Sequence, residues 1–138
     1  MDLYDRKIIG WAYGKNITAE LATQNVKNAC LNIPDTTGIV LHSDLGSQYT
    51  SEEFEKYLQD HGMLHSFSRK GNPYDNSYIE SFHSVLKNEE VYTTTYYTFE
   101  ESKSALFEYI ESFYNRKRRH NALDYKTPQQ VEDEALAA

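Results

Sequence analysis

The sequence contains little that would connect it with an oxidising or membrane environment. Its single cysteine, Cys30, cannot form an intramolecular disulfide. Because Cys30 falls within an apolar helical pattern, we expect it to be a small core residue in a reducing cytoplasm. No apolar run approaches the roughly 20 residues of a membrane-spanning helix, and the charged N-terminus lacks the apolar segment of a signal peptide. These features predict a cytoplasmic protein without a membrane partner.

Basic residues are scarce relative to acidic ones. The chain has 14 Lys and Arg residues against 21 Asp and Glu, which gives a formal net charge of −7. Since neutralised phosphates dominate the affinity of proteins for DNA, strong autonomous DNA binding is not expected. Two local basic clusters remain, at Arg69-Lys70 and Arg116–Arg119. The second is open to two interpretations: a patch that contacts phosphates, or a solvated helix end favoured by the helix dipole.

At 138 residues the chain is long enough for one domain with a buried core. We predict a single domain over residues 1–138, in which residues 120–138 form a C-terminal extension. The apolar pattern predicts a mixed α/β fold. The expected strands are Met1–Tyr4, Arg6–Tyr13, Gly38–Leu41 and Met63–Phe67, and the expected helices begin near Thr18, Thr50, Asn76, Thr98 and Thr127. Residues 92–97 are compatible with an extended connector or a short strand.

The most informative residues lie between positions 42 and 87. Asp44 follows a short apolar run typical of a buried strand, so its carboxylate is expected at a strand end. Glu80 lies on a helix that Asn76 is expected to cap and that ends near Val91. On this helix Glu80 and Lys87 fall two turns apart on one face. The opposite face is apolar and consists of Ile79, Phe82, Val85 and Leu86. An acid and a base would then face outward together, although a plain surface helix shows the same division.

His42 is close enough to Asp44 to raise two possibilities. It could bind a metal or act as a general base, or its ring could bond nearby backbone at the strand end, which is the interpretation we favour. The neighbouring Ser43 and Ser47 do not indicate a hydrolase triad, because the nucleophile-elbow context is lacking.

These residues resemble the catalytic core of insertion-sequence transposases of the retroviral-integrase superfamily (DDE type), specifically the second reading frame of two-frame bacterial elements. The second acidic residue of that family lies in an H-S-D-x-G-S-Q-Y-T/S segment, which is matched here by His42–Thr50. The third is a glutamate separated from it by 35 residues, as Glu80 is from Asp44. A basic residue seven positions later corresponds to Lys87. The resemblance also covers Asp2–Trp11, Tyr114-Asn115 and Lys126–Pro128.

The resemblance implies an RNase H-like mixed sheet flanked by helices, and an enzyme that cleaves and joins DNA phosphodiesters with Mg²⁺ (or Mn²⁺). Asp44 and Glu80 would supply two of the three carboxylates in a two-metal site, which suits the preference of Mg²⁺ for oxygen ligands. Lys87 would contact DNA near the cleaved phosphate. Further DNA contacts are expected from Gln48, Tyr49, Arg116, Arg118 and Arg119. The implied partners are element ends, target DNA and further copies of the chain.

The resemblance further implies that the family's first strand and first catalytic aspartate are missing here. Asp2 matches a later, non-catalytic position, and Asp5 stands where serine is usual. We therefore expect this chain alone to be weak or inactive in DNA transposition. One alternative is a non-catalytic remnant or a module that dimerises through the open sheet edge. Another is a nuclease for RNA–DNA hybrids, against which the 35-residue spacing and Lys87 argue.

Overall fold

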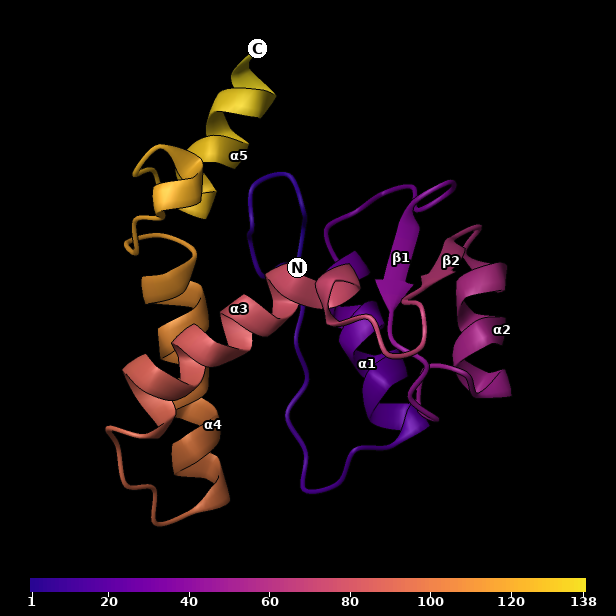
Figure 1. The fold of residues 1–138 in the computed structure, drawn as a ribbon, viewed down its shortest axis with the longest axis horizontal. Helices are drawn as coiled ribbons and strands as arrows, with labels where there is room; N and C mark the ends of the chain where they lie inside the picture. Colours follow the sequence, from indigo (N-terminus) through magenta and orange to yellow (C-terminus); the bar gives the residue numbers. More distant parts are fainter. The chain divides into compact units, whose positions relative to one another are not determined.

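The computed structural model describes all residues from Met1 to Ala138 and divides the chain into two compact units (Figure 1). The first, here named the sheet unit, is Ile9–Ser77. The second, the helical unit, combines Met1–Ile8 with Tyr78–Ala138. Each unit has its own buried apolar residues. The expectation of a single domain stays a prediction.

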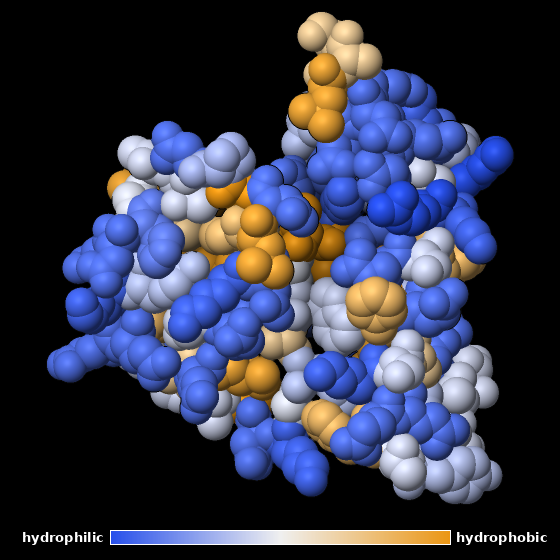
Figure 2. Space-filling model, turned by 180° about the vertical axis from the view of Figure 1, so that it is seen from behind, coloured by the Kyte–Doolittle hydropathy of each residue, from blue (hydrophilic) through white to orange (hydrophobic).

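Hydrophilic residues dominate one face of the structure (Figure 2). Most of the face seen in Figure 2 is hydrophilic, in keeping with a mean hydropathy of −0.74. A bilayer-spanning helix is absent, because each helix is too short or too polar for that role.

Two short parallel strands form the centre of the sheet unit. β1 (Val40–Ser43) pairs with β2 (Leu64–Phe67). They are joined by α2 (Glu52–Asp60), since parallel strands require a crossover connection. α2 also packs against β2 and against α1 (Ala19–Cys30). The core of this unit consists of Ala22, Val26, Phe54, Leu58 and Met63. The strand predicted at Met63–Phe67 and the two helices are therefore confirmed, and the strand predicted at Gly38–Leu41 forms two residues later.

The caps of these helices are set by local hydrogen bonds. Thr18 caps α1 as predicted, because its side chain accepts from the Leu21 N–H at 3.1 Å. α2 begins one residue later than predicted. Its cap is Ser51, which accepts from the Phe54 N–H at 3.2 Å. The prediction of Thr50 was wrong because its hydroxyl lies within hydrogen-bond distance of upstream backbone carbonyls instead.

The helical unit contains two α-helices that each continue as a π-helical segment. α3 (Ser77–Leu86) begins at the last residue of the sheet unit and continues as η2 (Lys87–Val91). α4 (Phe99–Phe107) continues as η3 (Glu108–Tyr114). The predicted helix end near Val91 is thus confirmed, and residues 92–97 form a connector without strand pairing.

The remaining elements of the helical unit are η4 (Asn121–Leu123), a 3₁₀ turn, and α5 (Pro128–Ala137). Thr127 caps α5 in a capping box with Gln130, as its position before proline suggested.

Aromatic contacts form the core of the helical unit. Phe82, on the apolar face of α3, meets the ring of Tyr114 edge-on, with centroids 4.9 Å apart and an angle of 77°. Tyr109 and Ile110 are buried on the same η3 segment as Tyr114. The sequence placed the apolar face of α3 on a sheet, but within this unit Phe82 packs on a helical segment.

The predicted strands Met1–Tyr4 and Arg6–Tyr13 do not form. The tight turn between them does, closed by a hydrogen bond from the Asp2 N–H to the Lys7 carbonyl at 2.9 Å. A strand requires a backbone partner for its N–H and C=O groups. At Ile8 that role is taken by the side chain of Asn115, which bonds both groups.

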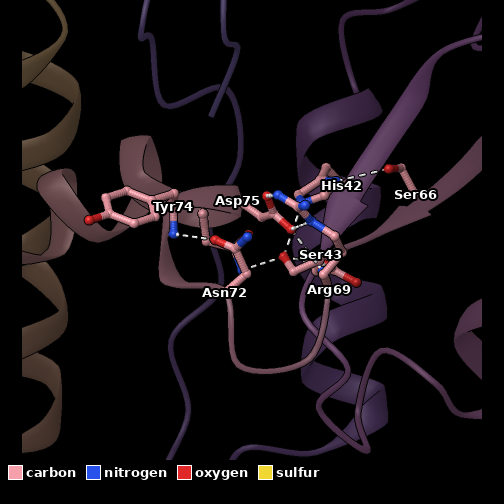
Figure 3. Close-up of polar contacts among 9 residues, drawn as sticks. His42, Ser43, Ser66, Arg69, Asn72, Tyr74 and Asp75 are labelled. Carbon is pink, nitrogen blue, oxygen red and sulfur yellow. Dashed lines mark hydrogen bonds and ion pairs between the residues drawn. The ribbon is translucent and has the colours of Figure 1, made fainter.

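The entry into α3 also differs from the prediction. Asn76 is not its cap but the last residue of a 3₁₀ turn, η1 (Pro73–Asn76). The cap of that turn is Asn72, whose side chain accepts from the Tyr74 N–H at 3.1 Å (Figure 3). Asn76 instead donates from Nδ2 to Ser68 Oγ at 2.5 Å, so its amide ties the turn back to the residue that follows β2.

Candidate active site

Asp44 follows the last residue of β1, as the sequence predicts, and it is exposed. Its Oδ1 accepts a hydrogen bond from the Gly46 N–H at 2.7 Å. A Cβ on Gly46 would lie 2.8 Å from Asp44 Oδ1 and 2.9 Å from the side-chain amide of Gln48. Gly46 therefore allows the turn to close against the carboxylate, and this closure uses Oδ1 but not Oδ2.

His42 has hydrogen-bond partners for both ring nitrogens. Nδ1 lies 2.9 Å from Ser66 Oγ, and Nε2 lies 3.0 Å from Ser68 Oγ (Figure 3). The partners are serine hydroxyls and not the backbone groups that we expected. Metal binding by either nitrogen would require one of these hydrogen bonds to break, so the structural interpretation of His42 fits best.

The loop after β2 is held beside His42 by an ion pair. Arg69 donates to the carboxylate of Asp75 from Nε at 3.1 Å, from a terminal nitrogen at 3.0 Å and from its backbone N–H at 2.9 Å. These hydrogen bonds lower the pKa of Asp75 to about 2. The start of the loop is fixed by the Ser68 N–H, which donates to the Ser43 carbonyl at 2.8 Å.

Gln48 and Tyr49, the predicted DNA contacts near Asp44, have different surroundings. Tyr49 is half-buried and meets Phe54 edge-on at a centroid distance of 5.5 Å. Burial, and then the charge of Asp44, raise the pKa of Tyr49. The side chains of Gln48 and Asp44 approach the same side of Gly46. Of the two, Gln48 is thus the one whose polar side-chain atoms lie beside the Asp44 turn.

Glu80 and Lys87 share one open pocket of about 390 Å³ in the helical unit. Its lining consists of Glu80, His83, Ser84, Lys87, Asn88 and Tyr92. The predicted common face of the acid and the base is confirmed. Burial, followed by the Lys87 ammonium, lowers the pKa of His83, while Glu80 acts in the opposite direction. His83 is therefore neutral at pH 7, and the charges of the pocket are those of Glu80 and Lys87.

The basic cluster after η3 is divided between an internal ion pair and the surface. Arg118 Nε lies 2.9 Å from both carboxylate oxygens of Glu89, and Tyr109 donates its hydroxyl to Glu89 at 2.6 Å. Burial opposes ionisation of Glu89, but these hydrogen bonds outweigh it and lower its pKa. Arg116, Lys117 and Arg119 are exposed, so they are the accessible members of the cluster.

Comparison with known proteins decides the family. The family described as "Integrase core domain" matches residues 1–73, and a second family with the same description matches residues 61–128. The chain belongs to the integrase core domain family. Members of this family of transposases and integrases are polynucleotidyl transferases that act on DNA, and their cores depend on divalent metal ions.

Two curated relatives of this integrase core domain are transposases of insertion sequences. The transposase of element IS904 from Lactococcus lactis is 40% identical over 132 residues, which are 96% of this chain and 52% of the relative. Transposase InsF of IS3A from Escherichia coli is 35% identical over 137 residues, which are 99% of this chain and 48% of the relative. The chain thus spans about half the length of these relatives.

Solved structures confirm the predicted RNase H-like fold of the integrase core domain. A chain of the simian T-cell lymphotropic virus intasome, solved with the PP2A regulatory subunit B56γ, superimposes with a TM-score of 0.65 at 18% identity. The match covers 86% of this chain and 41% of that one. The catalytic core domain of BIV integrase gives a TM-score of 0.61 at 24% identity, covering 87% of this chain and 74% of that one.

The oxygen donors of this integrase core are of the type that a hard divalent cation prefers. Within either unit, however, too few of them lie together to form a complete metal site. Asp44 and Glu80 both expose a carboxylate, the ligand that Mg²⁺ prefers. Neither unit gathers three or more His, Cys, Asp or Glu side chains around a possible metal position. Because Asp44 and Glu80 belong to different units, their convergence on one cation stays a prediction.

One set of hydrogen-bonded polar side chains was not predicted from the sequence. The Ser43 hydroxyl lies 2.8 Å from His65 Nε2, and Glu55 accepts at His65 Nδ1. These residues are 22 and 10 positions apart, so no helical or strand period connects them. The strand register could have revealed the first pair, because His65 lies opposite Leu41, two residues before Ser43.

Proposed function

We propose that this chain is the catalytic core of an insertion-sequence transposase, which cleaves DNA and transfers the strand with Mg²⁺ or Mn²⁺. The observation that carries the proposal is the integrase-type acidic motif at His42–Thr50, followed by Glu80 and Lys87 in one pocket. The curated relatives named as transposases support this choice of reaction and substrate.

Each residue has a defined role in the proposal. Asp44 and Glu80 would hold the metal, which activates the attacking oxygen and stabilises the leaving one when bound. Lys87 is the only cationic side chain of the Glu80 pocket at neutral pH, so its ammonium would bind a phosphate oxygen. Gln48 would donate its amide to a neighbouring phosphate or sugar oxygen.

Removal of Lys87 should weaken DNA binding. We expect Lys87→Ala to bind a fluorescein-labelled duplex less tightly and to reduce the slope of log Kd against log salt concentration by about 1. Fluorescence anisotropy at low ionic strength measures both quantities. The control is Lys103→Ala, which removes an exposed lysine from α4. Equal binding by the two variants would refute the role of Lys87.

Metal binding provides a second test that does not depend on turnover. Asp44→Asn should strongly reduce the broadening of the Gly46 backbone amide resonance by Mn²⁺, since the neutral oxygen of the new side chain attracts a divalent cation far less than a carboxylate does. The control is Asp133→Asn, an exposed aspartate on α5. Unchanged broadening in Asp44→Asn would contradict the proposed site.

Assembly and location complete the proposal. A transposase core is expected to act as a homo-oligomer on element ends and target DNA in the cytoplasm. Light scattering with and without Mg²⁺ tests the assembly. A dimer that is indifferent to metal, from a protein that also fails the Mn²⁺ test, would instead favour a non-catalytic dimerising module.

A further inference from the structure

A chain of three polar side chains joins α2, β2 and the end of β1 next to Asp44. Ser43, which is 7% exposed, donates its hydroxyl to the Asp44 carbonyl at 2.9 Å and lies 2.8 Å from His65 Nε2. On the other side of the ring, Nδ1 is hydrogen bonded to Glu55. The side chain of His65 is 5% exposed and that of Glu55 is 33% exposed, so the chain runs from the surface into the core.

The imidazole of His65 is fixed in orientation. It lies between the rings of Phe54 and Phe67, with centroid distances of 5.5 and 3.9 Å. Because Nδ1 faces a carboxylate oxygen, a proton lies between Nδ1 and Glu55. Nε2 is hydrogen bonded to Ser43 Oγ, and the ring proton sets the direction of that bond. Every member of the chain therefore has a defined partner.

The order acid, histidine, serine also occurs in hydrolases, but Ser43 does not act as a nucleophile here. Ser43 is buried, and its Oγ lies within hydrogen-bond distance of both the Asp44 carbonyl and His65 Nε2. A substrate carbonyl would have no access to Oγ. The hydrogen-bonded side chains of Glu55, His65 and Ser43 are suited to support neighbouring residues rather than to attack a substrate.

These side chains support Ser43, the residue directly before Asp44. The hydroxyl of Ser43 is held by His65, and its carbonyl accepts from the Ser68 N–H at 2.8 Å. The Asp44 carbonyl is held in turn by Ser43, and the Asp44 carboxylate by the Gly46 N–H. Both ends of the Asp44 turn are therefore fixed through Ser43 and Gly46.

We infer that His65 is a positioning residue, which acts with Glu55 through Ser43 to hold the Asp44 turn in the geometry that presents its carboxylate to a divalent cation. The inference rests on the proposed function and deepens it. Loss of a hydrogen-bonding group behind a metal ligand typically weakens metal binding 10- to 100-fold. Here the group acts through one intervening residue, so we expect about a 10-fold loss.

The test measures the turn first without metal. In the full 138-residue chain, His65→Gln and Glu55→Gln should lower the ¹⁵N order parameters of residues 44–46 from about 0.85 toward 0.6. Both variants should also need about 10-fold more Mn²⁺ to broaden the Gly46 amide resonance. Glu53→Gln is the matched control, because it removes the same charge from the same first turn of α2 at an exposed position. It should leave both quantities unchanged.

The outcomes separate this inference from the proposed function. Unchanged order parameters and Mn²⁺ response in a folded His65→Gln protein would overturn the inference. If His65→Gln does not fold, Glu55→Gln decides by the same criterion, since that side chain is partly exposed. Absence of Mn²⁺ broadening in the unmodified chain would refute the proposed function, whereas the metal-free order parameters would still decide whether His65 positions the turn.

Discussion

Asn115 is the residue whose replacement should damage the helical unit most. It is 1% exposed, and its side chain accepts from the Ile8 N–H at 2.9 Å and donates to the Ile8 carbonyl at 3.0 Å. Its own backbone carbonyl accepts from the Gln129 N–H at 2.9 Å. Through its side chain and its backbone carbonyl, this one residue joins the N-terminal segment to η3 and α5 within the unit. We predict that Asn115→Leu, which replaces the amide by an apolar group with the same branching, disconnects the first of these segments.

The magnitude follows from the two groups that lose their partner. Ile8 is 4% exposed, so its N–H and C=O would be left largely without water. A buried polar group without a hydrogen bond costs about 1–3 kcal/mol. Two such groups give about 2–6 kcal/mol, of which about 3 kcal/mol is a conservative value. Since about 1.4 kcal/mol is a factor of ten, the Ile8 amide should exchange with solvent about 100-fold faster.

Hydrogen exchange of the Ile8 amide and urea unfolding followed by circular dichroism measure this effect. Asn121→Leu is the control, because Asn121 is exposed and surface substitutions usually change stability by about 0.5 kcal/mol or less. If Asn115→Leu were as stable as Asn121→Leu, with unchanged exchange at Ile8, the Ile8 backbone would be satisfied without Asn115. The reasoning from buried hydrogen bonds would then be refuted.

Three further outcomes are expected. Gly10→Ala should destabilise the sheet unit by about 1–3 kcal/mol in thermal unfolding, because the added Cβ would lie 2.5 Å from backbone atoms of Ala29. Gly46→Ala should leave the melting temperature nearly unchanged but weaken Mn²⁺ binding at least several-fold, since its Cβ meets only movable side-chain atoms, among them the Asp44 carboxylate. The lowered pKa of Asp75 should stabilise the fold above its ordinary value of 3.8. That contribution should be lost as the pH falls toward about 2, and a carboxyl NMR titration of Asp75 should show a midpoint near 2.

Local signals in the sequence predicted the helices well. A capping side chain accepts a hydrogen bond from the backbone N–H three residues later. Thr18, Thr98 and Thr127 could therefore be identified from the sequence alone. The same logic was wrong at Thr50 and Asn76. The hydroxyl of Thr50 lies near upstream carbonyls, and the amide of Asn76 reaches Ser68, eight residues earlier. A cap is predictable only when its side chain has no competing partner.

The N-terminal strands show a second limit. Their alternation of apolar residues is a local property, but a strand exists only when another backbone pairs with it. At Ile8 the pairing comes from the side chain of Asn115, 107 residues away, and not from a strand. A pattern in the sequence could not have shown which group would satisfy this backbone.

The sequence by itself determined where the acidic and basic residues of the proposed site stand. The spelling around Asp44, the 35 residues to Glu80 and the helical spacing to Lys87 are properties of the linear chain, and the shared pocket of Glu80 and Lys87 follows from 3.6 residues per turn. Only the tertiary structure decided what supports them. The contacts of Ser43 with His65 and of Arg118 with Glu89 join residues 22 and 29 positions apart. Such pairs form when packing of the core brings distant segments together, and no period in the sequence encodes the partner.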